Sequence, residues 1–382
     1  MIPDGWTEMP LRAVIKLASG ESRPKDIRER PSGEHTSPVY GGNGVLGYSS
    51  VHNSVADDII IGRVGEYCGI TRFVGGPKWV TDNALFAKSV VHNVSREFLA
   101  LRLQHFDVSK LRSKGGQPLV SQEPIYAQCF TFPPIFEQKS IVSIISTWDR
   151  AIETVEALIA NARAQKKALM QSLLTGKMRL PGFSGAWRQV AISEIASEVS
   201  ERGLAHADYP VLSCSKHDGM VKSLSYFKKK VYSDDTSNYK VMRRGTFGFP
   251  SNHVEEGSIG HQDICDVGIV SPIYCVFRAN DKIEDGFLYK LLKTDRYRQI
   301  FAAATNASVD RRGSLRWKEF AKIKVPLPPL DEQAAINKLI DAADQCEQGY
   351  SIQLTALRQE KSALMQQLLT GKRRVQLEVE TA

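Results

Sequence analysis

The chain has 382 residues, of which 42% are hydrophobic and 24% charged, and this composition predicts a soluble globular protein with two or three domains. It has no apolar stretch long enough for a membrane span, no secretory leader and no CxxC pair among its six cysteines. We therefore expect a cytoplasmic protein with reduced, mostly buried thiols. The formal net charge of +8 favours an anionic partner.

The first predicted domain covers residues 1–133 and has mixed strand and helix patterning. Short β-rich runs at residues 57–64 and 69–75 lie among glycine and asparagine turns. Residues 96–106 have the apolar spacing of a helix, and a basic, glycine-containing loop follows at residues 112–122. These features indicate an α+β domain.

A long helix is predicted over residues 134–180. Pro133 and Pro134 suit its start, where a missing N–H group costs little, and Gly176 suits a cap at its end. Apolar residues recur at alternating steps of four and three, which is the heptad spacing of a coiled coil. The predicted seam comprises Ile141, Ile145, Trp148, Ile152, Val155, Ile159, Leu169 and Leu173. A helix of about 40 residues is about 60 Å long and must bury such a seam.

The second predicted domain covers residues 181–328 and follows the same order. Its β-rich runs lie at residues 209–214, 245–250 and 267–277, and a helical stretch follows at residues 285–301. The basic, glycine-containing loop comes last again. The similar order of elements predicts a second α+β domain related to the first.

Residues 329–376 repeat residues 134–181 at a constant offset of 195 without insertion, and 18 of 48 aligned positions are identical. The second seam comprises Ile336, Ile340, Tyr350, Leu354, Leu357, Leu364 and Leu368. Lys166, Lys361 and Glu347 interrupt the two seams, and a tail at residues 377–382 ends the chain.

Because the nearest equivalent seam for each long helix belongs to the other copy, we predict that the two helices form an antiparallel coiled coil that joins the two domains. Trp187 follows the first helix, whereas Trp6, in a similar context, opens the chain. The chain start thus looks like the continuation that the second helix lacks, which predicts a circular arrangement with pseudo-two-fold symmetry. The alternative is that each helix packs only on its own domain.

The sequence carries no recognisable catalytic motif. Residues 42–47 satisfy GxGxxG, but they follow no apolar strand and precede no helix that would bind a pyrophosphate. Glu137 and Lys139 resemble the end of a nuclease motif, but the repeat has Ala334 at the lysine position. The histidines lack partners at metal-ligand spacing. We therefore predict no catalytic residues and no metal site in this chain.

Basic residues gather with aromatic and amide side chains in both domains. Residues 216–244 hold eight basic and three acidic residues, and residues 290–318 hold eight basic and two acidic residues. Each of these residues taken alone could instead be an ordinary solvent-exposed side chain. Together, on two similar domains, they favour binding to double-stranded DNA. The predicted DNA-binding residues are Tyr40, Asn43, Arg63, Arg72, Lys78, Asn83, Lys114, Gln117, Lys216, His217, Lys228, Lys229, Arg243, Arg244, Asn252, Arg311, Arg312 and Arg316.

The PPxxEQ motif that starts each long helix and the KxALMQxLLTGKxR motif that ends it resemble the specificity subunit of type I restriction-modification enzymes. The opening Gly-x-Trp and the turn at residues 40–48 are also similar to this family. The resemblance covers essentially the whole chain. It implies that residues 1–133 and 181–328 are target-recognition domains, that each reads one half of a bipartite, asymmetric DNA site, and that the helices set the spacer.

The same resemblance implies partners. The helices would dock two methyltransferase (modification) subunits, and restriction subunits would complete the complex. S-adenosylmethionine, ATP and Mg would bind those partner subunits and not this chain, which would be non-catalytic. The chain departs from the pattern at Asp331, Glu347 and Gln376, which affects helix packing and not the resemblance.

Two other hypotheses stay open. The chain would be a stand-alone bipartite DNA-binding regulator without methyltransferase partners, or an enzyme whose site in one domain is not recognised. Two near-copies of the helix-end motif favour partners, because a DNA reader alone does not need them.

Overall fold

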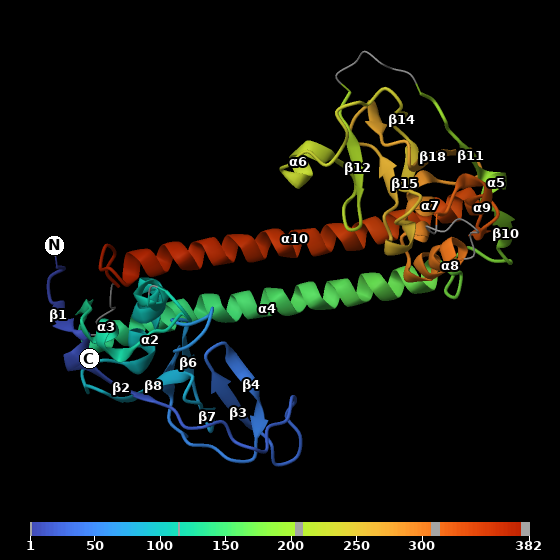
Figure 1. Ribbon diagram of the computed structural model, residues 1–382. Helices are drawn as coiled ribbons and strands as arrows, with labels where there is room; N and C mark the ends of the chain where they lie inside the picture. Colours follow the sequence, from blue (N-terminus) through green and yellow to red (C-terminus); the bar gives the residue numbers. More distant parts are fainter. Residues whose placement is uncertain (1, 114, 203–208, 307–313, 376–382) are drawn as a thin grey trace. The chain divides into compact units, whose positions relative to one another are not determined.

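The computed structural model describes residues 2–113, 115–202, 209–306 and 314–375 (Figure 1). Two compact units make up the chain. The first comprises Met1–Ala157 with Ser351–Ala382, and the second comprises Leu158–Tyr350. Two helices of 39 residues, α4 (Ile135–Leu173) and α10 (Leu330–Leu368), each contribute one part to each unit. Helix α4 ends short of residue 180, because Gly176 follows in a left-handed conformation with φ of 70°.

The first unit is built on sheets whose strands pair antiparallel, except that β3 and β7 pair in parallel. The four-stranded sheet has the order β2-β8-β5-β6, a three-stranded sheet has the order β4-β3-β7, and β1 pairs with β9. The strands are β1 (Thr7–Pro10), β2 (Ile15–Ser19), β3 (Ser37–Gly41), β4 (Gly44–Ser49), β5 (Asp58–Gly62), β6 (Thr71–Val74), β7 (Trp79–Val80), β8 (Ala84–Val90) and β9 (Cys129–Phe132). The predicted β-rich runs at residues 57–64 and 69–75 are therefore β5 and β6.

Four short helices cover the core of the first unit: α1 (Leu11–Val14), α2 (Arg96–Phe106), the 3-10 helix η1 (Val108–Leu111) and α3 (Gln122–Tyr126). Helix α2 matches the predicted bounds, because Ser95 caps its start and Asp107 ends it in a left-handed conformation. Its buried residues Phe98 and Leu103 belong to the core cluster that also contains Ile145 of α4 and Leu368 of α10. The ends of the long helices are thus part of the domain core.

The second unit repeats this framework. Its four-stranded sheet has the order β11-β18-β15-β16, β10 pairs with β19, and the pairs β12-β13 and β14-β17 form separate two-stranded sheets. The strands are β10 (Arg188–Ala191), β11 (Ala196–Glu198), β12 (Leu212–Ser215), β13 (Gly219–Lys222), β14 (Lys240–Arg243), β15 (Thr246–Pro250), β16 (Gly260–Gln262), β17 (Val267–Val270), β18 (Tyr274–Ala279) and β19 (Lys324–Leu327). The run predicted at residues 267–277 is divided between β17 and β18.

The helices of the second unit are α5 (Ile192–Ile195), α6 (Ser223–Phe227), η2 (Val254–Glu256), α7 (Asp285–Leu292), α8 (Asp295–Asn306) and α9 (Trp317–Phe320). The single helix predicted at residues 285–301 is wrong, because α7 ends before Lys293 and α8 begins after Thr294. The Thr294 hydroxyl donates to the Leu291 carbonyl at 2.7 Å, which satisfies an acceptor at the end of α7. The fold class predicted from the sequence, α+β with two related domains, is confirmed.

The Gln of each PPxxEQ motif joins a long helix to its domain. The fully buried Gln138 amide accepts from Ser95 N at 2.8 Å and donates to Asn93 O and Pro133 O at 3.0 and 2.8 Å. Gln333 makes the same bonds in the second unit, accepting from Glu284 N at 2.7 Å. This shared geometry makes Ser95 and Glu284 equivalent positions before α2 and α7.

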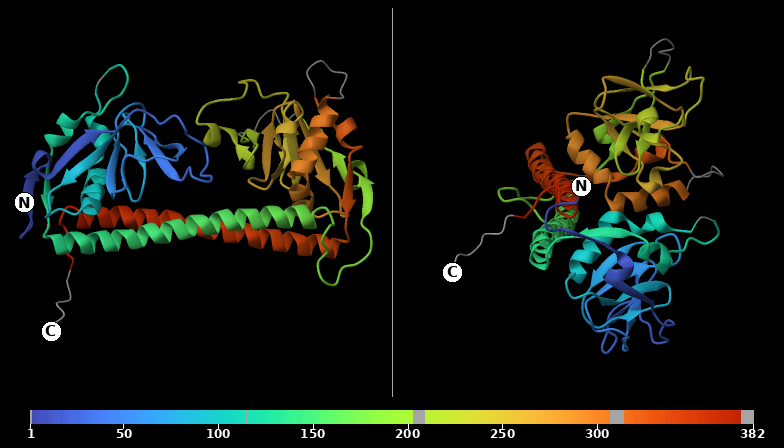
Figure 2. Two further views of the ribbon diagram at one scale, coloured as in Figure 1. Left: turned by 90° about the horizontal axis from the view of Figure 1, so that it is seen from below. Right: turned by 90° about the vertical axis from the view of Figure 1, so that its left-hand side faces the viewer.

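The two long helices pair in an antiparallel sense within the first unit, as Figures 1 and 2 show. Lys361 of α10 forms an ion pair with Asp149 of α4, and Arg358 pairs with Glu156 at 2.6 Å. As the residue number rises along α4, it falls along α10, which is the antiparallel order. The Lys361 seam position predicted as an interruption is therefore an interhelical ion pair.

The second unit shows the same pairing. Lys166 forms ion pairs with Asp344 and, at 3.3 Å, with Glu347, which also accepts from Arg163 at 2.7 Å. The Asp344 hydrogen bond and charge outweigh the cost of burial and raise the pKa of Lys166. Lys166 and Asp344 are the repeat equivalents of Lys361 and Asp149. The predicted antiparallel pairing is confirmed, and the alternative of helices packed only on their own domains is wrong.

The chain start completes the first unit, as the sequence predicted. Trp6 lies beside Gly371, and its ring faces the Arg374 guanidinium at 6.0 Å. Trp187 of the second unit lies in the same way beside Gly176, with the Arg179 guanidinium at 5.2 Å. The N-terminal segment therefore occupies the place that a continuation of α10 would fill.

All six cysteines are free. Cys68 and Cys275 are buried, Cys214 and Cys265 are partly buried, and Cys129 and Cys346 are exposed, so the expectation of mostly buried thiols is wrong. Both exposed thiols lie at positions whose side chains face away from the cores. Across the described ranges, no helix is long and apolar enough to cross a membrane.

Candidate nucleic-acid interface

The glycine-rich turn between β3 and β4 is fixed by close backbone contacts in the first unit. A Cβ atom on Gly62 would lie 2.3 Å from the Gly42 carbonyl oxygen, and one on Gly42 would lie 2.5 Å from the Val64 carbonyl oxygen. Only glycine fits at such an approach. The turn places Asn43 on the surface between the two strands, so the GxGxxG pattern belongs to a β-hairpin and does not open a helix.

Two arginines predicted to bind DNA lie against this turn. Arg72 Nη2 donates to the Asn43 carbonyl at 3.2 Å, and Arg63 Nη1 donates to Ser19 Oγ at 2.9 Å. The Arg63 backbone N–H bonds the Asn83 carbonyl at 3.0 Å, which places the exposed Asn83 side chain nearby. The structure therefore brings Asn43, Arg63, Arg72 and Asn83 together. Arginine and asparagine are the side chains that read base edges in the major groove.

Arg63 and Arg72 each have a guanidinium nitrogen that makes no hydrogen bond to a described residue. Within the described part of the chain, Arg63 Nε and Arg72 Nη1 are buried without a hydrogen-bond partner. Tyr40 lies at the same turn, where burial chiefly, with the nearby Tyr48, raises the pKa of its hydroxyl. The hydroxyl therefore stays protonated and is a neutral donor or acceptor. This set, Tyr40, Asn43, Arg63, Arg72 and Asn83, is called the first polar cluster below.

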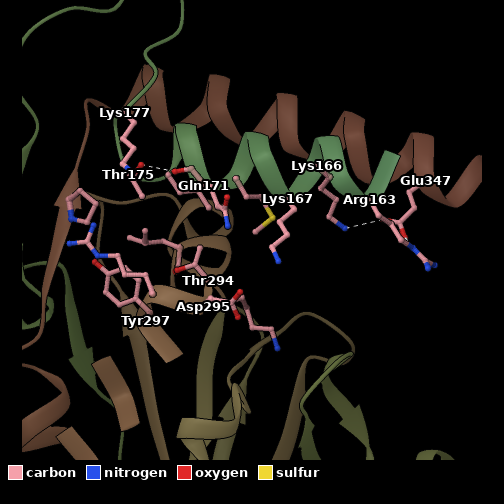
Figure 3. Close-up of a pocket in the computed structure, with 16 residues that line it drawn as sticks. Arg163, Lys166, Lys167, Gln171, Thr175, Lys177, Thr294, Asp295, Tyr297 and Glu347 are labelled. Carbon is pink, nitrogen blue, oxygen red and sulfur yellow. Dashed lines mark hydrogen bonds and ion pairs between the residues drawn. The ribbon is translucent and has the colours of Figure 1, made fainter. Parts of the chain in front are cut away.

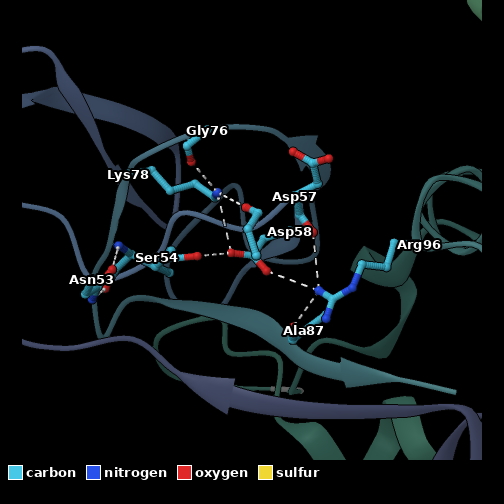
Figure 4. A network of polar contacts seen from close by, with 10 residues as sticks. Asn53, Ser54, Asp57, Asp58, Gly76, Lys78, Ala87 and Arg96 are labelled. Atoms are coloured by element: carbon cyan, nitrogen blue, oxygen red, sulfur yellow. Dashed lines mark hydrogen bonds and ion pairs between the residues drawn. The ribbon is translucent and has the colours of Figure 1, made fainter. Parts of the chain in front are cut away.

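Lys78 does not belong to the first polar cluster, and its prediction as a DNA-binding residue is wrong. Its side chain is fully buried, and Nζ donates to the carbonyls of Ala56 and Gly76 beside the buried Asp58 carboxylate, 3.5 Å away (Figure 4). Arg96 approaches the same carboxylate at 3.2 Å. A lysine that neutralises a buried carboxylate has no free charge for a phosphate.

The remaining prediction in the first unit concerns the loop before α3. Gln117 is exposed there, and the neighbouring backbone is tied to the first polar cluster because Val120 N donates to the Arg63 carbonyl at 2.9 Å. Lys114 lies outside the described residues.

In the second unit, the turn between β12 and β13 presents Lys216 and His217 to solvent. Lys293 Nζ holds the turn by donating to the Lys216 carbonyl at 2.7 Å and to the Gly257 carbonyl at 3.0 Å. Ser215 Oγ accepts the His217 backbone N–H at 3.2 Å. The turn is therefore fixed by its backbone, which leaves both side chains free to contact a ligand.

The basic run at residues 216–244 carries less free charge than the sequence indicates. Arg243 forms a two-bonded ion pair with Glu201 at 2.6 and 3.0 Å, and Arg244 pairs with Asp266 at 3.0 Å. Both acids lie outside the run, so the local charge count missed them. Lys228 and Lys229 remain exposed after α6, without an ion pair to any described residue.

Asn252 and Arg316 lie on segments joined by a backbone hydrogen bond. Leu315 N donates to the Ser251 carbonyl at 2.8 Å, which places Arg316, an exposed residue, next to the partly exposed Asn252. Arg311 and Arg312 lie outside the described residues. The turn residues Lys216 and His217 and the separate pair Asn252 and Arg316 are grouped under the name second polar cluster below.

One feature that the sequence did not predict is an open cavity in the second unit. Its lining includes Lys167 of α4, Lys177 shortly after the end of α4 and Arg296 of α8. The first two belong to the repeated motif that ends the long helix, so the only signal was a basic motif interpreted as part of a coiled coil.

Comparison with known families gives one match over most of the chain. Residues 3–162 and 205–356 match the family model of the type I restriction modification DNA specificity domain. The two matched segments correspond to the two repeats seen in the sequence and in the fold.

Curated relatives show the same likeness. The type I restriction enzyme MjaVIII specificity subunit of Methanocaldococcus jannaschii is 23% identical over 300 residues, which are 73% of this chain and 70% of the relative. The putative MjaX specificity subunit of the same organism is 23% identical over 364 residues, which are 84% of this chain and 79% of the relative.

Solved structures are similar in fold. The S subunit of a type I restriction-modification system from M. genitalium matches with a TM-score of 0.61 at 17% identity, over 95% of this chain and 96% of its own. The HsdS subunit from Thermoanaerobacter tengcongensis matches with a TM-score of 0.52 at 17% identity, over 97% and 98% of the two chains.

Proposed function

Since the chain belongs to the type I restriction modification DNA specificity family, we propose that each of its domains reads one half of a bipartite, asymmetric DNA site. The first polar cluster serves the first half-site and the second polar cluster serves the second. Exposed lysines supply salt-dependent contacts to phosphates, and asparagine and arginine side chains supply the base choice. The compartment we propose is the cytoplasm, where six free thiols stay reduced.

The observation that carries this proposal is one framework with two unlike surfaces. Both units have a four-stranded sheet, a helix held by the Gln of PPxxEQ and the same pairing of the long helices. Their outer turns differ, because a glycine hairpin presents Asn43 in one and a lysine-histidine turn presents Lys216 in the other. Equal frameworks with different surfaces suit the reading of two different half-sites.

The long helices have a second role in this proposal, which is to set the spacer and to dock two methyltransferase subunits. Large apolar side chains are exposed on them away from the seam, such as Ile352 of α10 in the first unit and Leu158 of α4 in the second. The catalytic work belongs to the partners, which bind S-adenosylmethionine, ATP and Mg, and restriction subunits complete the complex. This chain is the non-catalytic reader.

Domain exchange tests the proposal in the assembled complex. Residues 181–328 are replaced by the second domain of another specificity subunit, the chain is co-expressed with its methyltransferase subunits, and methylated bases are mapped across the genome. We expect one half of the methylated site to change and the other to stay. A change in both halves contradicts the modular assignment. Tight, specific binding by the chain alone, without any copurifying methyltransferase, supports the stand-alone regulator instead.

A further inference from the structure

The second unit contains an open cavity of about 770 Å³ between the end of α4 and the segment where α7 gives way to α8 (Figure 3). Gln171 and Lys167 point from α4 toward Thr294 and Asp295 across the cavity. Met170, Leu174 and Leu291 supply apolar surface. A volume of this size falls within the range of small-molecule sites, about 300 to 1,000 Å³.

The cavity lining is strongly basic. Six of the lining residues are basic and two are acidic. The basic residues are Arg163, Lys166, Lys167, Lys177, Lys293 and Arg296, and the acidic ones are Asp295 and Glu347. Arg163 and Lys166 are neutralised by the ion pairs with Glu347 and Asp344 described above.

Four of these cations form no ion pair with a described residue, and one of them, Lys293, donates to the Lys216 and Gly257 carbonyls. Lys167, Lys177 and Arg296 are exposed and form no ion pair with any described residue. Asp295 pairs with Arg298 at 3.1 Å instead. The backbone of Asp295, Arg296 and Tyr297 forms the first turn of the 12-residue helix α8, whose N-terminal partial charge is also positive. These positive charges repel one another, and an anion bound in the cavity would reduce that repulsion.

The first unit has an arginine at the place that is equivalent to Leu291 of the cavity lining. Arg102 follows the equivalent position Ser95 by the same interval as Leu291 follows Glu284. Arg102 packs over the Phe130 ring at 4.9 Å and donates to the Leu369 carbonyl, and Leu369 is the repeat equivalent of the cavity residue Leu174. Burial lowers the pKa of Arg102 to about 10. The first unit thus has a bonded guanidinium at the position where the second unit has Leu291, which lines the cavity.

We propose that the cavity of the second unit binds phosphate groups, supplied by the DNA backbone or by a free nucleotide. Lys167, Lys177 and Arg296 contact the phosphate oxygens, and the apolar surface accepts a sugar or base. The DNA arm rests on the proposed function, because it adds a backbone contact near the second half-site reader. The nucleotide arm is independent of it.

The test uses the full chain and two probes, a short fluorescent DNA duplex of random sequence and ATP without metal. Binding is followed by fluorescence anisotropy over a salt series for the duplex and by calorimetry for ATP. The variant K167Q/K177Q removes two of the cations that lack counter-charges. Its matched control is K372Q, because Lys372 is the repeat equivalent of Lys177 in the first unit, where Arg102 is in place.

We expect K167Q/K177Q to weaken one of the probes about tenfold, and for DNA to reduce the salt slope by about two. K372Q should change neither. The decisive variant is Leu291→Arg, which places in the cavity the arginine that the first unit has at this position. It adds a positive charge and yet should weaken binding, whereas a site made only of surface charge would bind more tightly. If thermal unfolding shows that this variant is unstable, Met170→Trp fills the same hollow from α4.

Loss of DNA binding in these variants shows that the cavity binds phosphates of the DNA backbone. Loss of ATP binding alone shows that it binds a free nucleotide. Unchanged binding of both probes by K167Q/K177Q overturns the proposal, and so does parental or tighter binding by the folded cavity-filling variant. The methylated sequence in the assembled complex should stay the same in every variant. A result that overturns the cavity proposal therefore leaves the proposed function standing. A domain exchange that contradicts the proposed function likewise leaves the cavity result standing.

Discussion

Arg374, close to the end of the described chain, forms a two-bonded ion pair with Glu137, at the start of α4, with both N–O distances at 2.8 Å. Glu137 is buried, and the Arg374 side chain also donates to the Asp4 carbonyl at 2.7 Å. The repeat equivalents Arg179 and Glu332 make the same pair at 2.6 Å in the second unit. The Glu of PPxxEQ and the final Arg of the helix-end motif are thus one device that joins the two long helices.

We expect Arg374→Met to lower the free energy of unfolding of the first unit by about 2 kcal/mol, because it leaves the Glu137 carboxylate buried without its partner. The figure is at the low end for a broken buried pair, since the arginine itself is partly exposed. Chemical denaturation measures it. Arg373→Met is the control, because Arg373 is the exposed neighbour and its side chain makes no ion pair with a described residue. An equal loss of unfolding free energy in both variants would contradict a stabilising role for the Arg374–Glu137 ion pair.

Lys78→Met should destabilise the first unit by about 3 kcal/mol, because the buried Asp58 carboxylate then keeps Arg96 as its one ion-pair partner among the described residues. The salt dependence of DNA binding should not change, since Lys78 is not on the surface. Lys88→Met is the control for stability, because Lys88 is an exposed residue of β8. A salt slope reduced by about one in folded Lys78→Met would restore the residue to the DNA interface.

Thiol reactivity should separate the cysteines by environment. Burial raises the pKa of the Cys214 and Cys275 thiols to about 12, so both stay protonated and unreactive in the folded chain. At mildly alkaline pH, iodoacetamide should label the exposed Cys129 and Cys346 first, as peptide mass mapping will show.

The raised pKa of these two thiols also makes the stability of the fold depend on pH. An unfolded thiol titrates near about 8.5, and the folded state holds its proton up to a higher pH. The stabilisation from the Cys214 and Cys275 thiols is therefore complete below the unfolded pKa and is lost as pH rises through the interval up to about 12. Cys275→Ala should flatten the fall of the unfolding temperature in this alkaline interval. The same fall in the variant as in the parent chain would refute this.

Asn43→Ala should relax the first half of the methylated site and leave the second half unchanged, because Asn43 lies in the first polar cluster. Loss of a two-bonded base contact costs about 1 to 3 kcal/mol of discrimination at one base pair. Asn252→Ala is the reciprocal control in the second domain. Methylation mapping of the assembled complex reads both. If both variants relax the same half, the assignment of domains to half-sites is wrong.

Insertion of one heptad into α4 after Glu156 and one into α10 after Leu354 should lengthen the spacer of the methylated site. Seven helical residues add about 10 Å, which is close to three base pairs. The seam register is kept because both insertions are whole heptads. An insertion in α4 alone breaks the pairing of Lys166 with Asp344 or of Lys361 with Asp149 and should abolish methylation. An unchanged spacer with both insertions would exclude the helices as its ruler.

Several parts of the structure could be predicted because their signals are local or repeated. The bounds of α2 follow from Ser95 and the apolar spacing after it, and the long helices follow from heptads between a proline pair and a glycine. The place of Trp6 beside Gly371 follows from the comparison of the two repeats. The sequence did not predict the break between α7 and α8, because the apolar pattern continues across Lys293 and Thr294, whereas Thr294 N bonds the Leu291 carbonyl three residues back and α7 ends.

The candidate site was predicted only in part. Asn43, Arg63, Arg72 and Asn83 do come together, whereas Lys78 is buried and Arg243 is neutralised by Glu201, 42 residues away in sequence. Residue type and local charge do not reveal which acid folds back onto which base. They also do not distinguish a lysine that turns inward from one that faces solvent.

The sequence by itself determined the repeat, the antiparallel partners, the closure by the chain start and the family, because each rests on a periodic pattern or on two copies compared at a fixed offset. Only the tertiary structure decided which charges remain free and where space is left. Leu291 lines the cavity beside Lys167 at the position where the first unit has Arg102, and each of these residues meets a long helix or the segment after it only after folding. Free charge and empty volume depend on contacts between distant segments, which no local pattern encodes.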